Sequence, residues 1–155
     1  MQKIKDRIML GIFSGLVGSV PGRLLNAVEH DLGLTDSTYG QMAAHQFINK
    51  NKINTPDGVL LGSVANELIA LSTGIVITYT LSATGRDHAV IKGMGVGSFY
   101  WFLLYGLSAQ LGKTAKSKKP LSLLYSLVDH LIFGSTAGII ISELGDDSLF
   151  PDGRT

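Results

Sequence analysis

The residues with the clearest capacity for chemistry are polar side chains that stand inside strongly apolar stretches. They are Arg23 and Asn26 in the first stretch, Asn66 and Glu67 in the second, and Asp129 and His130 in the last. An ionisable group inside a bilayer costs about 2.5–3.5 kcal/mol on insertion scales, so it usually faces the protein interior and has a partner. These six side chains could exchange a proton, hold an ion, or neutralise one another.

The spacing of these residues predicts that they meet at one depth. At 1.5 Å per residue, Glu67 and Asp129 both lie about 12–14 Å from the starts of their segments, which run parallel in a four-pass bundle. The first segment runs in the opposite direction. This places Arg23 within about 8 Å of the same face of a hydrocarbon core about 30 Å thick. We therefore expect one polar cluster in one half of the membrane, and the sequence leaves open which acid pairs with Arg23.

The elements that position these residues follow from composition and hydropathy. Only 16% of the 155 residues are charged, whereas 45% are hydrophobic and 19 are glycine. Such a composition is typical of membrane proteins rather than soluble domains. Four stretches have the length and apolarity of transmembrane helices, and they span about 8–34, 58–81, 89–111 and 121–144. The sequence predicts an all-α protein, a four-helix transmembrane bundle in a single domain over residues 1–155.

The connecting segments give two further expectations. The longest loop, 35–57, contains Tyr39–Ile48, which we expect to form a short helix in the membrane interface. The acidic tail, 145–155, is expected to be frayed.

Glycines mark the helix faces that pack. Small residues four positions apart let helix backbones approach closely. They recur on one face of the first segment and as pairs in the last two segments: Gly11, Gly15, Gly18, Gly22, Gly93, Gly97, Gly134 and Gly138. Together with the aromatic run Phe99–Phe102, the glycine face of the first segment favours a homo-oligomer or a subunit of a larger membrane complex.

Several function classes are disfavoured. The net charge of +1 gives no field that would attract nucleic acid, and the chain has no cysteine. No nucleophile elbow, phosphate-binding loop or dinucleotide motif is present. The histidines lack metal-ligand spacing. We therefore expect no enzyme activity, no cofactor, no metal and no nucleic-acid partner, with the lipid bilayer as the surrounding medium.

Basic residues leave the orientation open. With the N-terminus inside, six Lys and Arg residues fall on each side of the membrane, and Arg23 lies within it. The excess of cytoplasmic positive charge that usually fixes orientation is thus missing. A balanced count permits insertion in both orientations.

Two stretches, "DRIMLGIFSGLVG" at Asp6–Gly18 and "SLVDHLIFGSTAG" at Ser126–Gly138, resemble small four-helix bacterial membrane proteins of uncharacterised function. This resemblance implies a bacterial cytoplasmic membrane and no assigned activity. "GLVGSVPGR", Asn66 and "GVGSF" are similar in order to the dual-topology fluoride channels. The chain differs from those channels by lacking their Thr- and Ser-rich break and by its intramembrane acids.

Two functions fit these observations. In the first, the protein is a small ion- or proton-coupled transporter or channel, in which Glu67 and Asp129 carry charge, His130 tunes them and Arg23 is the counter-ion. In the second, it is a non-transporting membrane subunit that binds partner helices or lipids, and the polar cluster is purely structural.

Overall fold

The structure is a computed structural model, and it describes residues 3–107 and 118–151. Within these ranges the protein is helical and forms no strand. The α-helices are α1 (Arg7–Asp31), α2 (Tyr39–His45), α3 (Pro56–Thr84), α4 (Ala89–Trp101) and α6 (Ser122–Leu144). A π-helical turn, η2 (Phe102–Leu107), continues α4, and two 3₁₀ turns are η1 (Lys50–Lys52) and η3 (Asp147–Leu149).

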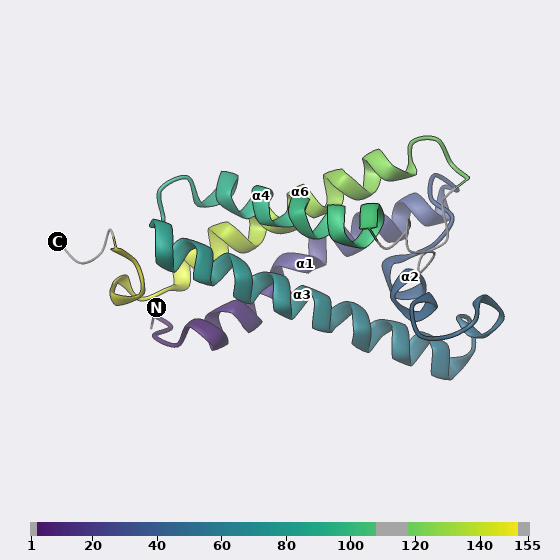
Figure 1. The fold of residues 1–155 in the computed structure, drawn as a ribbon, viewed down its shortest axis with the longest axis horizontal. Coiled ribbons are helices and arrows are strands. Elements are labelled where there is room, and N and C mark those ends of the chain that lie inside the picture. The colour runs from purple at the N-terminus through teal and green to yellow at the C-terminus, as the bar shows by residue number, and fades with distance from the viewer. Residues whose placement is uncertain (1–2, 108–117, 152–155) are drawn as a thin grey trace.

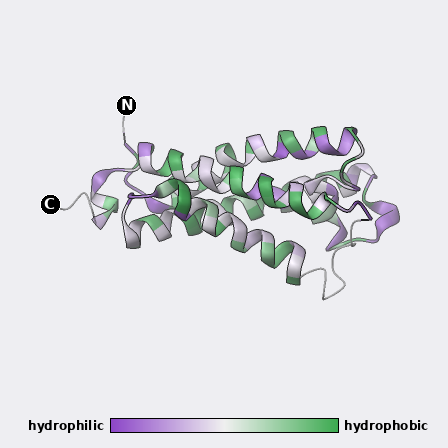
Figure 2. Cartoon of the chain, turned by 90° about the horizontal axis from the view of Figure 1, so that it is seen from above, coloured by the Kyte–Doolittle hydropathy of each residue, from purple (hydrophilic) through white to green (hydrophobic). Residues whose placement is uncertain are grey.

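The predicted four-helix transmembrane bundle is confirmed. The helices α1, α3, α6 and the continuous stretch Ala89–Leu107 are each long and apolar enough to cross a membrane. Hydrophilic residues gather at the two ends of the bundle in Figure 2, and apolar residues cover most of the length between them. The end of the third predicted segment, 108–111, lies outside the described residues.

Local signals set the helix ends and explain why α3 is longer than the predicted 58–81. The Thr55 side chain accepts a hydrogen bond from the Gly58 amide at 3.2 Å, and Pro56 occupies the first turn, where its missing N–H costs nothing. The helix ends at Gly85, whose φ of 90° suits glycine alone. At the start of α1, the Asp6 side chain caps the Met9 amide at 2.8 Å.

Helix α1 packs against both α3 and α6 through its glycine face. A Cβ atom at Gly11 or Gly15 would collide with the α3 backbone, at Ile75 and Ala70. At Gly18 and Gly22 it would press on the α6 backbone, at Ala137 and Asp129. The face is therefore used within the chain, and it no longer argues for a partner helix.

The glycine pairs of α4 and α6 pack against each other. An added Cβ atom at Gly93 would meet the carbonyl oxygen of Gly134, and one at Gly97 would meet that of His130. On α6, Gly138 lies in the same way against the Ala89 carbonyl. These contacts make α4 and α6 the closest neighbours in the bundle, because backbone meets backbone without side chains between them.

The two described ends of the chain are joined at one end of the bundle (Figure 1). The Ile4 amide donates to the Leu144 carbonyl at 2.8 Å, and the Asp146 amide donates to the Ile4 carbonyl at 2.9 Å. Phe150 is fully buried, and the Arg86 guanidinium lies 4.9 Å from the centre of its ring. The prediction of a frayed tail is wrong for residues 145–150, since one aromatic anchor outweighs the acidic composition around it.

The short helix expected over Tyr39–Ile48 spans Tyr39–His45 and lies at the other end of the bundle (Figure 1). A capping box starts it: the Thr38 side chain accepts from the Gln41 amide, and the Gln41 side chain accepts from the Thr38 amide. Gly40 approaches Gly62 so closely that a Cβ atom at Gly62 would strike the Gly40 carbonyl. The helix is thus fixed against α3 and directs its first residue into the bundle.

Candidate functional site

The site is organised by Tyr39, the first residue of α2. Its backbone amide donates to Asn26 Oδ1 on α1 at 2.8 Å, and its hydroxyl donates to Asp129 Oδ2 on α6 at 2.6 Å. Burial is the main cause that raises the pKa of the Tyr39 phenol above its ordinary value, and the nearby Tyr105 and Asp129 add to it. Tyr39 therefore stays protonated and serves as a hydrogen-bond donor to the acid.

Asp129 is the most deeply placed acid of the site. It is 1% exposed, although it lies in a helix that can cross the membrane. Among the described residues, no hydrogen-bond donor reaches its second oxygen, Oδ1. Burying a carboxylate oxygen without a partner costs free energy. The Asp129 carboxyl therefore favours either a bound proton or a cation bound beside it.

Aromatic rings surround His130 beside this acid. The Tyr39 and Tyr105 rings lie 5.5 Å and 5.8 Å from the His130 ring, both nearly perpendicular to it. Nδ1 of His130 lies 2.7 Å from the Ser126 carbonyl oxygen, which fixes the ring orientation. Instead of contacting Asp129 through a hydrogen bond, His130 forms part of an aromatic wall.

The π-helical turn η2 supplies Tyr105, one of the two tyrosine rings beside His130. It brings Tyr105 towards α2, where the Tyr105 hydroxyl donates to Met42 Sδ at 3.2 Å. Trp101 stacks on Tyr105 at 6.5 Å between ring centres, and its indole N–H donates to Ser126 Oγ at 2.9 Å. Single π-helical turns inside α-helices are frequent at functional sites because they reposition side chains there.

Arg23 pairs with Glu67, across α1 and α3. The side chains are 38% and 29% exposed, so this ion pair lies near the edge of the bundle. Oε2 of Glu67 has no hydrogen-bond partner among the described residues. The positive charge of Arg23 is thereby offset on α3, and among the described residues Asp129 has no ion-pair partner.

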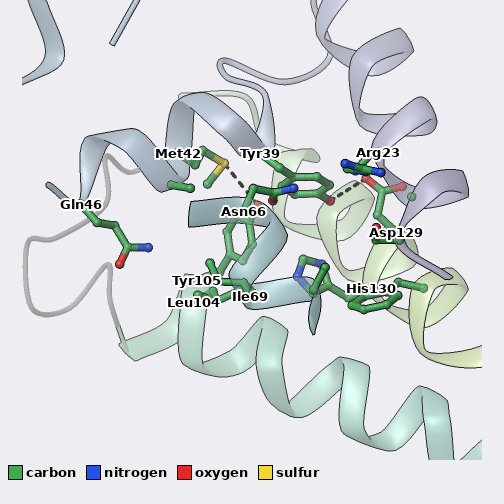
Figure 3. Close-up of a pocket in the computed structure, with 15 residues that line it drawn as sticks. Arg23, Tyr39, Met42, Gln46, Asn66, Ile69, Leu104, Tyr105, Asp129 and His130 are labelled. Atoms are coloured by element: carbon green, nitrogen blue, oxygen red, sulfur yellow. Dashed lines mark hydrogen bonds between the residues drawn. The ribbon is translucent and has the colours of Figure 1, made fainter. Parts of the chain in front are cut away.

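These side chains line a first cleft at the α2 end of the bundle (Figure 3). Its lining comes from α1, α2 with the residue after it, α3, η2 and α6: Ser19, Gly22, Arg23, Tyr39, Met42, Ala43, Gln46, Asn66, Ile69, Ala70, Leu104, Tyr105, Asp129, His130 and Phe133. A second, more polar cleft adjoins it, lined by Asn26, Ser63 and Glu67 among others. Arg23, Tyr39 and Asn66 line both and separate them.

The six polar residues singled out in the sequence all line one of these two clefts. Asn66, Asp129 and His130 line the first cleft, and Asn26 and Glu67 line the second. Sequence reasoning missed Tyr39 and Met42, which come from the loop. The sequence predicted the short helix that carries them, but nothing in the sequence gives the direction of this helix.

Beyond the cleft, the interior of the bundle is closed. Towards the end where Ile4 and Phe150 lie, the side chains facing inwards have no exposed surface: Leu10, Ser14, Thr73, Ile77 and Thr78. The contacts of Gly11 and Gly15 with α3 lie in the same half. The clefts thus occupy one half of the molecule, and the other half is packed.

The described residues contain no group of three or more His, Asp and Glu side chains that could hold a metal ion. Comparison with protein-family models, with curated proteins and with solved structures finds no match. The resemblance to small four-helix membrane proteins is therefore supported only by the four membrane-length helices. Function must be argued from the geometry of the cleft.

Proposed function

We propose that the protein is a small proton-linked transporter and not an enzyme, with Asp129 as the residue that carries the proton. The observation that carries the proposal is the state of this acid. It is buried within a membrane-length helix and lines a cleft. One of its oxygens accepts a hydrogen bond from Tyr39, and the other has no partner in the part of the chain that the structure describes. Intramembrane acids of this kind mark proton and ion pathways in transport proteins.

The uneven interior supports transport rather than an open channel. A cleft in one half and a packed interior in the other correspond to one of the two states that alternating access requires. The packed half rests on glycine contacts such as those of Gly11 and Gly15, across which helices can shift without moving large side chains. Glu67 has a different role in this proposal, as the partner that neutralises Arg23.

A second candidate is a non-transporting subunit with a purely structural cluster, and the Arg23–Glu67 ion pair favours it. Association with a second copy or a partner fits the outer face of the third span, where Phe99 and Phe102 are each 57% exposed. The two candidates differ in one measurable respect: only the first requires Asp129 to exchange protons with water.

The test is proton movement into liposomes that contain the purified protein and a pH-sensitive dye. A potassium diffusion potential, negative inside, is imposed with valinomycin. We expect faster acidification than in protein-free liposomes, and we expect Asp129→Asn to abolish the difference.

The matched control is Asp57→Asn, an exposed acid in the first turn of α3, which should keep the wild-type rate. Equal rates for wild-type protein, Asp129→Asn and empty liposomes would contradict the transporter and leave the structural role.

A further inference from the structure

The first cleft, which Asp129 lines, has the chemistry of a site for an organic cation. We propose that it binds a small monovalent ammonium compound with an apolar group, and that the positive charge faces Asp129 Oδ1. The inference rests on the proposed function, because it takes the Asp129 carboxylate to be shared by the proton and the solute.

Charge is the first support. Glu67 offsets Arg23, and no cation lies within ion-pair distance of Asp129 among the described residues. Glu29, near the end of α1, has a buried carboxylate oxygen without a partner and adds negative potential at Asp129. With these acids ionised, the field in the cleft is negative, so it attracts a cation and disfavours an anion.

The walls are the second support, and they distinguish an organic cation from a metal ion. Metal ions such as Mg²⁺ and Ca²⁺ need several oxygen ligands, whereas Asp129 is the one carboxylate among the described residues that line the first cleft. Most of the surface around it is apolar or aromatic: Tyr39, Met42, Ile69, Leu104, Tyr105 and Phe133. Tyrosine rings attract cations through their negative faces, and the apolar side chains suit hydrocarbon groups.

The arrangement of the lining is the third support. A single acid, two tyrosine rings and an apolar floor would hold one charged head and one hydrophobic group. We infer that Tyr39 positions the carboxylate and that Tyr105 contacts the cation directly.

The probe is benzyltrimethylammonium, and the readout is the fluorescence of Trp101, the only tryptophan in the chain, which stacks on Tyr105. In a non-ionic detergent we expect saturable quenching. The neutral isostere neopentylbenzene and the anion phenylacetate should fail to compete. Asp129→Asn should weaken binding at least about tenfold, because it removes the charge that attracts the cation.

A pair of Tyr105 variants tests whether the aromatic ring at this position contributes to cation binding. Tyr105→Phe keeps the aromatic face and should bind within about twofold of wild type, whereas Tyr105→Leu should bind about threefold to fivefold more weakly. Asp57→Asn should bind normally. Size-exclusion profiles and helical circular dichroism identify any variant that fails to fold, and the Tyr105 pair then decides the assignment.

Competition with protons is a second readout. Affinity should rise with pH, up to tenfold per unit while Asp129 titrates, and this rise should vanish in Asp129→Asn. The charged and titratable groups around Asp129 are Arg23 and Glu29 on α1, Tyr39 on α2, Tyr105 on η2, and His130, the next residue on α6. A pH effect that persists in Asp129→Asn would assign the competing proton to one of these groups and overturn the shared carboxylate.

The outcomes separate the two proposals. Cation binding that depends on Asp129, without proton flux in liposomes even when benzyltrimethylammonium is present on one side, keeps the site and removes the transporter. Proton flux without cation binding, or equal binding of phenylacetate, overturns the organic-cation site. A lipid headgroup offers the same ammonium chemistry, so a soluble short-chain phosphatidylcholine is titrated in parallel. Binding of that lipid more tightly than benzyltrimethylammonium would overturn a free solute as the ligand.

Discussion

At the residue scale, two acids at similar depth have different environments. Glu67 lies beside Arg23 near the edge of the bundle. Asp129 lies in the interior, and among the described residues only the Tyr39 side chain donates a hydrogen bond to its carboxylate. Sequence spacing placed both acids near Arg23 and could not choose between them, because side-chain reach exceeds the difference in depth. The choice is made by α2, whose tyrosine occupies the space beside Asp129.

The ion pair gives the first prediction. Arg23→Gln should lower the free energy of unfolding by about 1–3 kcal/mol, because it leaves the half-buried Glu67 charge without a partner. The double variant Arg23→Gln/Glu67→Gln should recover most of this loss. Both are measured by circular dichroism as sodium dodecyl sulfate is titrated into micelles of the protein. Losses that simply add in the double variant would show that the two side chains are not coupled.

Tyr39 gives the second prediction. Tyr39→Phe keeps the ring but removes the donor to Asp129 Oδ2, which leaves both carboxylate oxygens without a donor from residues 3–107 and 118–151. We expect a loss of about 1–3 kcal/mol in the same unfolding measurement, the cost of an unsatisfied buried polar group. The control is Tyr79→Phe, on the exposed surface of α3, which should stay within about 0.5 kcal/mol of wild type. Equal effects of the two variants would argue against the hydrogen bond.

At the element scale, glycine decides which helices touch. The two glycines Gly93 and Gly95 lie in the same helix, α4, yet they differ in surroundings. A Cβ atom at Gly93 would overlap the Gly134 carbonyl, whereas at Gly95 nothing lies within 4 Å.

Gly93→Ala should destabilise the protein by about 1–3 kcal/mol through overpacking. Gly95→Ala should be neutral or stabilising by up to about 1 kcal/mol, because alanine favours the helix. Thermal unfolding of the pair tests this, and equal midpoints would refute it.

The elements also show how far the sequence could predict this molecule. Hydropathy over a window of about 20 residues located the four spans, because a membrane imposes length and apolarity on each helix separately. The direction of α2 and the aromatic walls of the cleft could not be predicted. They depend on contacts between segments distant in the chain, such as Tyr39 with Asp129 and Met42 with Tyr105. The burial of Phe150 was not predicted either. The acidic composition of the tail as a whole predicted fraying, and this average concealed one apolar ring that packs into the bundle.

At the scale of the whole molecule, the two ends of the bundle differ. One holds the clefts, and the other is fastened by the chain ends, where Asp146 accepts hydrogen bonds from the Ser148 amide and hydroxyl at 3.1 Å and 2.7 Å. These side-chain and backbone hydrogen bonds lower the pKa of the Asp146 carboxyl below its ordinary value of 3.8. A lowered pKa means that the ionised group stabilises the folded end above pH about 4, and that this contribution is lost as the pH falls further.

This gives the fourth prediction. Hydrogen exchange of segment 145–150, corrected for its intrinsic pH dependence, should speed up between pH 5 and pH 3. Asp146→Asn should show the faster exchange already at pH 5 and little further change. Asp57→Asn, at the other end of the bundle, should keep the wild-type response. An identical pH response in wild type and Asp146→Asn would assign the acid sensitivity to another group.

Ile4 and Phe150 lie together at the end opposite the clefts. The orientation of the chain in the membrane therefore also determines which side of the membrane the clefts face. A reporter fused after the last residue marks the membrane side that the clefts do not face. If that reporter is cytoplasmic, the clefts face outwards, and under the proposed function this state would load an importer. If it is external, the clefts face the cytoplasm, and under the same proposal this state would load an exporter. Insertion in both orientations, which the balanced lysines and arginines permit, would then place importing and exporting copies of one sequence in the same membrane.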